Sequence, residues 1–492
     1  MKVKVTPPGK RAPPPAEASA FDKRTLQDVY DEIKSVYSAD HRPWVVGFSG
    51  GKDSTATLQL IWQAIAQLPR GQRTKPIYVI SSDTLVETPA IVGYIERTHK
   101  QITDVAKAQG MPFQAHKVTP KIHDTFWVNL IGRGYPAPQK TFRWCTDRLK
   151  IQPADQFIVE RVSEHGEAIL VLGVRKDESM TRAQVMSLMK IKDSLLSRHS
   201  RFAQVLVYTP IEEFNVNDVW SVLLQNESPW GGNNRDLAAL YRNASGECPL
   251  VVDTYTPSCG GSRFGCWTCT VVTKDKSMEA MIDSGEVWMQ PLLDFRDFLA
   301  STHELENKKK WREHKRRDGR VKAKSDGSGK IVRGPYRLWF CKELLERLLT
   351  IQVQLQKTGP DPNVELISAA ELAEIRQLWR MERGDWEDSV PAIVKQVTGK
   401  DLDWVHDDHG SFTATEAMIL QQVCEEADVP TNMVVKLLEA ERQLAGMSRR
   451  SSIYTRIDSI LREDWRSEED VLKETGEADE TVEDELEPEA TP

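Results

Sequence analysis

The chain has 492 residues, 40% of them hydrophobic and 28% charged, a balance typical of a globular protein with two or three domains. No run of about eighteen apolar residues occurs, so no membrane partner is expected. The first twenty residues lack the apolar core of a secretory signal. We therefore expect a cytoplasmic protein that begins with a disordered arm at residues 1–20.

The net charge of −8 hides two segments of opposite sign. Ser467–Pro492 carries twelve acidic residues and one lysine, a net charge of −11, and is expected to be disordered. Lys308–Arg337 carries thirteen basic and three acidic residues, a net charge of +10. A polyanion is therefore a possible ligand of the basic segment, and a solvated hairpin or linker is the alternative.

Residues 44–60 contain the most informative pattern. An apolar strand is predicted at 45–48, a glycine-rich turn at 49–55, and a helix after it. A turn between a strand and a helix directs backbone N–H groups at an anion. Val46 and Asp53 stand where a Walker A loop has a glycine and a hydroxyl residue, so this is a different phosphate loop. The alternative is a structural glycine turn.

Other strands are predicted at 75–81, 113–118, 168–174 and 203–208, and helices at 21–37, 88–108, 150–162 and 217–224. Strands that alternate with helices indicate an α/β fold with a doubly wound parallel sheet. Asp83, Thr84 and Arg175 follow predicted strands. Because ligands bind at the carboxyl ends of parallel strands, these residues are expected near the glycine loop.

A basic stretch at 141–150 contains Cys145. Neighbouring cations lower the pKa of a thiol and favour its reactive thiolate form, so Cys145 is a candidate catalytic residue, with a packed cysteine as the alternative. Candidates to bind a second anion, each of which could instead form a surface ion pair, are Arg143, Arg148, Lys150, Arg175 and Arg182.

Four of the seven cysteines lie close together with the spacing C-x10-C-x6-C-x2-C. They are Cys248, Cys259, Cys266 and Cys269. Four thiolates suit zinc and an iron–sulfur cluster equally in ligand type. Cys341 and Cys424 lie in apolar helical stretches and are expected in the core.

The remaining sequence predicts a helical C-terminal region, which could bind a partner protein or pack on the catalytic core. The expected organisation is a disordered arm (1–20), a nucleotide-binding domain (21–240), a Cys-rich region (241–300), a basic segment with a helix (301–357), a helical domain (358–466) and an acidic disordered tail (467–492).

The segments SGGKDST, SDTLVET, FRWCTDRLK and GVRKDES, in this order, resemble the sulfonucleotide-reductase and ATP-sulfurylase branch of the PP-loop ATPases. With NLIGRGYPAP, SPWGGNNRDL and SRFGCWTCTVVTKDKSMEAMID, the sequence is similar to the DndC family, the sulfurtransferases of bacterial DNA phosphorothioation. The resemblance implies an adenine nucleotide alpha hydrolase-like fold and cleavage of ATP between its α- and β-phosphates. Implied ATP contacts are Ser49, Gly50, Gly51, Lys52, Asp53, Ser54, Asp83 and Thr84, with Lys52 and Asp53 as catalytic residues.

The resemblance further implies Mg²⁺, a 4Fe–4S cluster rather than zinc, and DNA as the substrate. A cysteine desulfurase would donate sulfur, and other Dnd modification subunits would complete a multiprotein complex. The alternatives are a sulfonucleotide reductase that uses thioredoxin and a zinc-stabilised DNA-binding module. The enzymatic interpretation requires the glycine loop to lie at a cleft near Asp83 and Arg175.

Overall fold

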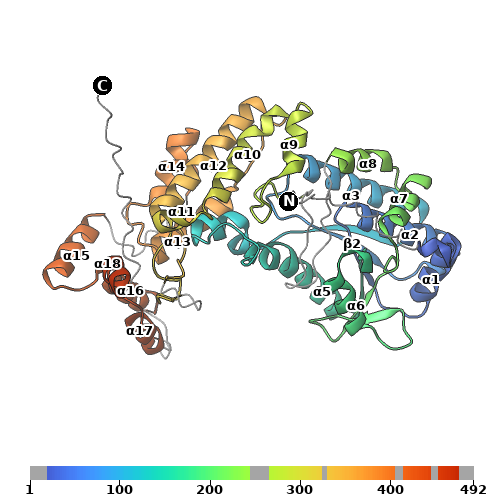
Figure 1. Cartoon of the computed structure of the whole chain (residues 1–492), viewed down its shortest axis with the longest axis horizontal. Coiled ribbons are helices and arrows are strands. Elements are labelled where there is room, and N and C mark those ends of the chain that lie inside the picture. Colours follow the sequence, from blue (N-terminus) through green and yellow to red (C-terminus); the bar gives the residue numbers. More distant parts are fainter. Residues whose placement is uncertain (1–18, 244–264, 324–329, 405–413, 445–452, 476–492) are drawn as a thin grey trace, which may run out of the picture. The chain divides into compact units, whose positions relative to one another are not determined.

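The computed structural model describes residues 19–243, 265–323, 330–404, 414–444 and 453–475 (Figure 1). The chain divides into two compact units. The first consists of residues up to Thr119 together with Thr146–Cys266, and the second of Pro120–Cys145 together with residues from Trp267 onward. Among the described helices, none has the length and apolar run that crossing a bilayer requires.

A six-stranded sheet forms the centre of the first unit, in the order β3-β2-β1-β4-β6-β5. All neighbours pair in parallel except β5 and β6. The strands are β1 (Trp44–Gly47), β2 (Ile77–Ser82), β3 (Phe113–Val118), β4 (Ala168–Val171), β5 (Leu196–Arg198) and β6 (Val205–Tyr208). The order reverses between β1 and β4, and in a doubly wound sheet such a switch point is where ligands bind.

Helices cover both faces of this sheet, because successive strand residues point to opposite sides (Figure 1). Trp44 and Val46 face a core that includes side chains of α1, α2, α3, α7 and α8, whereas Val45 faces a core with α5. The helices of this unit are α1 (Leu26–Ser38), α2 (Lys52–Ala66), α3 (Pro89–Gln109), α5 (Gln152–His165), α6 (Met180–Met189), α7 (Val216–Gln225) and α8 (Asn234–Asn243). The α/β fold predicted from the sequence is confirmed.

The second unit is helical. Its helices are α9 (Lys276–Asp283), α10 (Gln290–Ser301), α11 (Leu305–Trp311), α12 (Leu338–Thr358), α13 (Ala369–Glu382), α14 (Ser389–Thr398), α15 (Ala414–Glu426), α16 (Thr431–Leu444), α17 (Ile453–Leu461) and α18 (Glu468–Thr475); α4 (Trp144–Thr146) spans the boundary between the units in the sequence. Cys341 and Cys424 are buried, as predicted.

Residues 120–145 belong to this helical unit, although the predicted boundaries assigned them to the nucleotide-binding domain. Two buried tryptophans explain the difference. The indole of Trp127 donates to the carbonyl of Leu366 at 2.6 Å, and the indole of Trp379 donates to the carbonyl of Ile131 at 3.0 Å. These long-range contacts join an early segment to late helices, which local sequence patterns do not reveal.

The prediction of disorder for residues 467–492 is wrong for Glu468–Thr475, which form α18. Acidic residues in the first turn of a helix interact favourably with its dipole. Val471 of α18 is buried, and Glu468 pairs with Arg333 and Arg337. The rest of the predicted tail and residues 1–18 of the predicted arm lie outside the described residues.

Candidate active site

The glycine loop connects β1 to α2, which begins at Lys52. Within it, the Ser49 and Ser54 hydroxyls lie 3.1 Å apart, and the Ser54 hydroxyl donates to the carbonyl of Gly51 at 3.0 Å. These contacts hold the loop closed around the first turn of α2. The amino end of a helix carries partial positive charge, so the loop presents an anion-binding surface.

Gly50 is required by the shape of this loop. Its φ of +72° lies in the left-handed region, and a Cβ there would approach Ile95 Cδ1 to 2.7 Å. A side chain at position 50 would therefore be strained by this φ, and it would also push aside the end of the Ile95 side chain on α3.

Lys52, Asp53 and Arg175 form a buried charge network. The Lys52 ammonium lies 2.7 Å from Asp53 Oδ2, and the Arg175 guanidinium donates through Nε to Asp53 Oδ1 at 2.6 Å. Arg175 also pairs with Asp177 at 3.0 Å. The network therefore connects the first turn of α2 to the segment that follows β4.

Gly173 permits this close approach. A Cβ at position 173 would lie 2.7 Å from both the Asp53 carbonyl oxygen and Thr57 Oγ1. The glycine of the GVRKDES segment thus lets the chain after β4 pass against α2 and places Arg175 beside Asp53.

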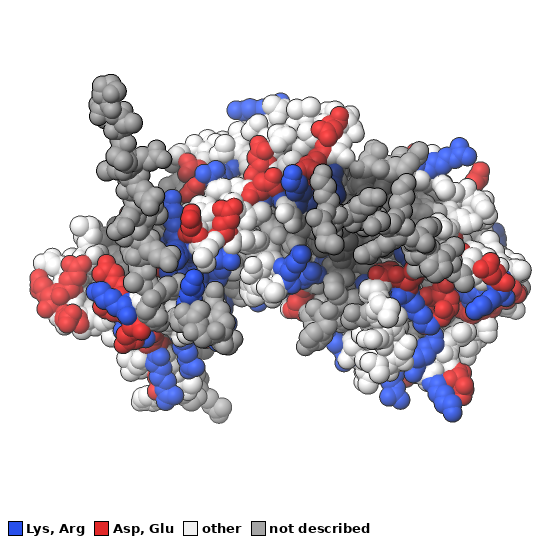
Figure 2. Space-filling model, viewed as in Figure 1, with Lys and Arg blue, Asp and Glu red and all other residues white. Residues whose placement is uncertain are grey.

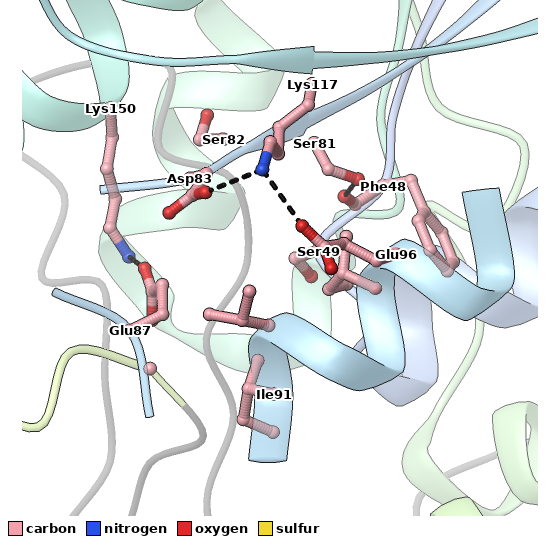
Figure 3. Close-up of a pocket in the computed structure, with 13 residues that line it drawn as sticks. Phe48, Ser49, Ser81, Ser82, Asp83, Glu87, Ile91, Glu96, Lys117 and Lys150 are labelled. Atoms are coloured by element: carbon pink, nitrogen blue, oxygen red, sulfur yellow. Dashed lines mark hydrogen bonds and ion pairs between the residues drawn. The ribbon is translucent and has the colours of Figure 1, made fainter. Parts of the chain in front are cut away.

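A narrow pocket lies at the carboxyl ends of β1 and β2 (Figure 3). Polar groups of the loop and strand ends occupy one part of it, and apolar side chains of α3 another. Its lining consists of Phe48, Ser49, Ser81, Ser82, Asp83, Glu87, Ile91, Val92, Ile95, Glu96, Lys117, Lys150 and Gly265. Its volume is about 60 Å³, so a nucleotide must displace side chains to enter, because small-molecule sites enclose roughly 300–1,000 Å³.

Lys117 bridges the two sides of the pocket, as Figure 3 shows. Its ammonium lies 3.2 Å from Asp83 Oδ2 and 3.1 Å from Glu96 Oε1. Burial lowers the pKa of Lys117, but the hydrogen bond to Glu96 and the charge of Asp83 outweigh burial, and the net pKa is raised. The lysine is thus cationic, and its side chain, 39% exposed, can be displaced by a ligand at modest cost.

Cys266 lies at the edge of the same pocket. Its Sγ is 3.3 Å from Thr84 Oγ1 and 3.6 Å from Glu87 Oε1. The backbone holds it there, because the Thr88 N–H donates to the carbonyl of Gly265 at 3.2 Å. Glu87 also lies 3.9 Å from the ammonium of Lys150. The end of the Cys-rich region therefore forms part of the wall behind Asp83 and Thr84.

The structure brings together part of the predicted site. Ser49, Asp83 and Lys150 line the pocket, and Thr84 is buried beside it. The other predicted residues of the loop follow Ser49 in the chain, and the Ser49 N–H donates to the hydroxyl of Ser54. They are Gly50, Gly51, Lys52, Asp53 and Ser54. The loop therefore meets the requirement of proximity to both Asp83 and Arg175.

The other predicted anion ligands are placed differently. Arg175 and Arg182 are buried and ion-paired, Arg182 with Glu178. Neither these two arginines nor Arg148 is among the described residues that line the pocket. Arg143 and Cys145 belong to the second unit, and their roles stay predictions.

Sequence reasoning missed Glu87, Lys117 and the apolar wall from α3. Lys117 lies near the end of β3, which pairs with β2, so the rule that placed Asp83 at the sheet edge could have placed Lys117 there too. Glu87 gave a weaker signal, because its position depends on contacts with Thr84 and Cys266 rather than on a strand end.

A half-buried histidine supports the pocket floor. His99 Nε2 lies 2.7 Å from the hydroxyl of Ser81, which donates to the carbonyl of Phe48 at 2.6 Å. Burial and the neighbouring His116 and Lys117 lower the pKa of His99 to about 4. The imidazole is therefore neutral near pH 7 and fixes the ends of β1 and β2 without adding charge.

Two of the four predicted metal ligands, Cys248 and Cys259, lie outside the described residues. Cys266 and Cys269 are half-buried, and neither forms a disulfide. Arg296 is fully buried and donates to the carbonyls of Cys269 and Thr273 at 3.0 and 2.9 Å, which fixes the backbone after the pair. Cys266 and Cys269 have C-x2-C spacing, and the backbone after them is fixed. They could therefore provide two of the four thiolate ligands of a 4Fe–4S cluster or a zinc ion.

Comparisons with known proteins agree with this architecture. Residues 43–272 match the model of the phosphoadenosine phosphosulfate reductase domain. An uncharacterised protein of Methanocaldococcus jannaschii is 26% identical over 256 residues, which cover 52% of this chain and 42% of that relative. The chain thus spans less than half the length of this relative.

Two kinds of solved structure are also similar. The U34-tRNA thiolase NcsA of Methanococcus maripaludis, solved with its [4Fe-4S] cluster, aligns with 44% of this chain and 72% of its own, with 12% identity and a TM-score of 0.27. The FMN adenylyltransferase of Candida glabrata aligns with 40% of this chain and 57% of its own, with 13% identity and a TM-score of 0.24. Residues 43–272 are thus similar in sequence to a phosphoadenosine phosphosulfate reductase domain, and they include the sheet of an α/β PP-loop-like fold.

Proposed function

We propose that this protein is an ATP-dependent sulfurtransferase that replaces a non-bridging oxygen of a DNA backbone phosphate with sulfur. The observation that carries the proposal is one pocket whose wall includes Ser49 of the phosphate loop, Asp83 after β2, and Gly265 next to Cys266. In this proposal, the site for nucleotide phosphates and the site for sulfur chemistry would be adjacent. The choice of DNA rests on the sequence resemblance and on the basic segment.

The first step activates the acceptor. A non-bridging oxygen of the DNA phosphodiester attacks the α-phosphorus of ATP, the bond from this phosphorus to the α,β-bridging oxygen breaks, and pyrophosphate leaves. The loop and the amino end of α2 would hold pyrophosphate, and Lys52 would offset its growing charge. Asp53 or Asp83 would hold Mg²⁺, which would help to neutralise the charge of the phosphates.

The second step introduces sulfur. The terminal sulfur of a persulfide, supplied by a cysteine desulfurase, attacks the activated DNA phosphorus, and AMP leaves with the former DNA oxygen. A thiol then attacks the remaining S–S bond, so a disulfide departs and the sulfur stays on phosphorus as the thioate. Lys150 would neutralise the phosphate of departing AMP, with Glu87 holding the lysine in place.

Cys248, Cys259, Cys266 and Cys269 would hold a 4Fe–4S cluster, which supplies a site for sulfur or its relay. Cys145 remains a candidate carrier of the persulfide. Other Dnd modification subunits are the proposed partners that choose the DNA sequence.

An isotope experiment tests the first step. DNA with ¹⁸O in its non-bridging phosphate positions is incubated with ATP, Mg²⁺ and a persulfide donor, and the nucleotide product is analysed by mass spectrometry. The proposal expects ¹⁸O-labelled AMP and a sulfur-containing dinucleotide in the digested DNA. Unlabelled AMP, or ADP in place of AMP, would contradict it.

A matched pair of variants ties the activity to the pocket. Lys52→Ala should abolish AMP formation because the charge beside pyrophosphate is lost, whereas Lys107→Ala, an exposed lysine of α3, should leave it unchanged. Because Lys52 is buried, a thermal melt of each variant separates loss of chemistry from loss of folding.

A sulfonucleotide reductase is the second candidate, because residues 43–272 match the phosphoadenosine phosphosulfate reductase domain. Such an enzyme would release sulfite from adenylyl sulfates with thioredoxin as the reductant and would have no need of DNA. Sulfite release without DNA would favour the reductase over the sulfurtransferase.

A further inference from the structure

The cations of the basic segment do not form one uniform surface. Antiparallel bridges join Arg312 to Tyr336 and Ala323 to Ile331, so the segment folds back on itself as a hairpin. The hairpin divides its basic side chains into an inner set that contacts other parts of the second unit and an outer set that is exposed.

The inner set stabilises the fold. The Arg312 guanidinium donates to the carbonyl of Gly334 at 2.7 Å, and burial lowers the pKa of Arg312. Arg333 and Arg337 both pair with Glu468 at the start of α18, Arg337 at 2.6 Å. These three cations are committed to internal contacts and are poorly placed for an external ligand.

The outer set consists of Arg316, Arg320 and Lys322, which are exposed and have no side-chain hydrogen bond or ion pair within the described part of the chain. Their neighbour Arg317 is held against Tyr135, with its guanidinium carbon 5.3 Å from the ring centroid. Three charged side chains within seven residues are thus exposed and unpaired as far as the described residues show.

An open hollow of about 670 Å³ adjoins the outer set. Its lining consists of Arg320, Val321, Arg462, Glu463, Asp464, Trp465 and Arg466. The two acids are already neutralised, because Glu463 lies 2.6 Å from the Lys436 ammonium and Asp464 accepts from Arg466 at 2.8 Å. Arg462 pairs with Asp458 at 3.0 Å, so Arg320 supplies the remaining positive charge of the lining.

Lys315 adds to this positive field, whereas Lys436 is already paired with Glu463. The ammonium groups of Lys315 and Lys436 lie 4.4 and 5.4 Å from the ring centroid of Trp465. Burial, then the charge of Lys436, lower the pKa of Lys315. Figure 2 shows Lys and Arg side chains interspersed with acidic ones around α16 and α17, and mainly acidic side chains at α15.

We propose that the outer set and this hollow bind the phosphate backbone of DNA, an inference that rests on the proposed function. Guanidinium groups bind phosphate through two parallel hydrogen bonds, and Arg320 is exposed at the rim of the hollow. Because contacts to phosphates carry no sequence information, this surface positions the acceptor strand without choosing the sequence.

The test measures binding of a fluorescent DNA duplex of arbitrary sequence to the full chain across a range of salt concentrations. The variant Arg316→Ala/Arg320→Ala/Lys322→Ala should bind at least roughly tenfold more weakly, with the slope of log K against log salt reduced by about 2–3, because each lost phosphate contact removes about 0.9. Duplexes of unrelated sequence should bind the wild type equally.

A second triple variant is the matched control. Arg70→Ala/Lys100→Ala/Lys107→Ala removes the same charge from exposed positions of the first unit and should leave the salt slope unchanged. An equal loss in both triples would overturn the proposal, since the effect would then be one of net charge.

The outcomes separate this inference from the proposed function. If wild type fails to bind DNA, both the surface and the DNA acceptor are wrong. If wild type binds but the outer triple binds equally well, only the surface is wrong. Formation of AMP in the presence of high DNA concentrations should persist in the triple, because the pocket residues are untouched.

Discussion

Arg175 Nε lies 2.6 Å from Asp53 Oδ1, and this contact joins two segments 122 residues apart in the sequence. The side chain of Arg175 is 1% exposed and its guanidinium pairs with Asp53 and Asp177, while its backbone N–H donates to Glu178 at 2.9 Å. The sequence suggested Arg175 as a ligand for a second anion. The structure instead gives it a position from which it holds Asp53, and thereby the first turn of α2.

Replacing Arg175 should therefore act mainly on the stability of the fold rather than directly on catalysis. Arg175→Met leaves Asp53 with one cationic partner and should lower the free energy of unfolding by about 3 kcal/mol, because breaking a buried ion pair strands a charge. Denaturant unfolding measures the loss. Arg462→Met is the control, since Arg462 and Asp458 form an exposed pair and should contribute less than about 1 kcal/mol. Equal losses would show that the Asp53 contact contributes no special stability.

The glycine loop gives a second prediction. Gly50→Ala should destabilise the protein by about 1–3 kcal/mol, because a non-glycine residue is strained at positive φ and its Cβ meets Ile95. AMP formation should fall with it as the loop moves away from α3. Gly71→Ala is the control, because no atom lies within 4 Å of its Cβ position. Thermal melts that rank Gly71→Ala as the worse variant would contradict the loop geometry.

His99 predicts a pH dependence of stability. Its pKa is about 4 in the folded protein against the usual 6.5 of a histidine, so the unfolded chain binds more protons between these values. The contribution of His99 is therefore fully present above about pH 6.5 and is lost as the pH falls toward about 4, a change on the order of 3 kcal/mol. His99→Gln should flatten the unfolding free energy over this window. A wild-type slope in the variant would contradict the buried neutral state.

Cys266 should be needed for sulfur transfer and metal content but not for nucleotide cleavage. Cys266→Ser is expected to lose bound iron and phosphorothioate formation while it retains AMP formation, because Ser49 and Lys52 are unchanged. Cys424→Ser, a buried cysteine of α15, should retain all three properties. Elemental analysis of anaerobically purified protein measures the metal, and zinc without iron would favour a structural site.

Glu468 tests the contact between α18 and the hairpin. Glu468→Gln removes the charge that pairs with Arg333 and Arg337 and should lower the unfolding free energy by about 1–3 kcal/mol, the range for charge-assisted hydrogen bonds. Glu469→Gln is the adjacent control, because Glu469 is exposed. If the two variants melt alike, the pairing of Glu468 does not stabilise this unit.

Local patterns in the sequence were sufficient for the sheet. Apolar runs located β1, β2, β4 and β6, because buried strands need continuous apolar residues. The strand β3 was also predicted, although its sequence FQAHKV is only partly apolar. The edge strand β5 was missed because three residues carry too little signal. The acidic composition of α18 suggested disorder, but the buried Val471 and the pairing of Glu468 outweigh it.

By itself the sequence determined the α/β class and the position of the phosphate loop at the end of β1. It also placed Asp83 at the same sheet edge, because the carboxyl ends of parallel strands meet there. Only the tertiary structure decided that Arg175 is an internal partner of Asp53, that Lys117 bridges the pocket, and that Cys266 lies beside Thr84. Each of these is a contact between segments far apart in the chain, and its geometry depends on how whole elements pack rather than on local residue patterns.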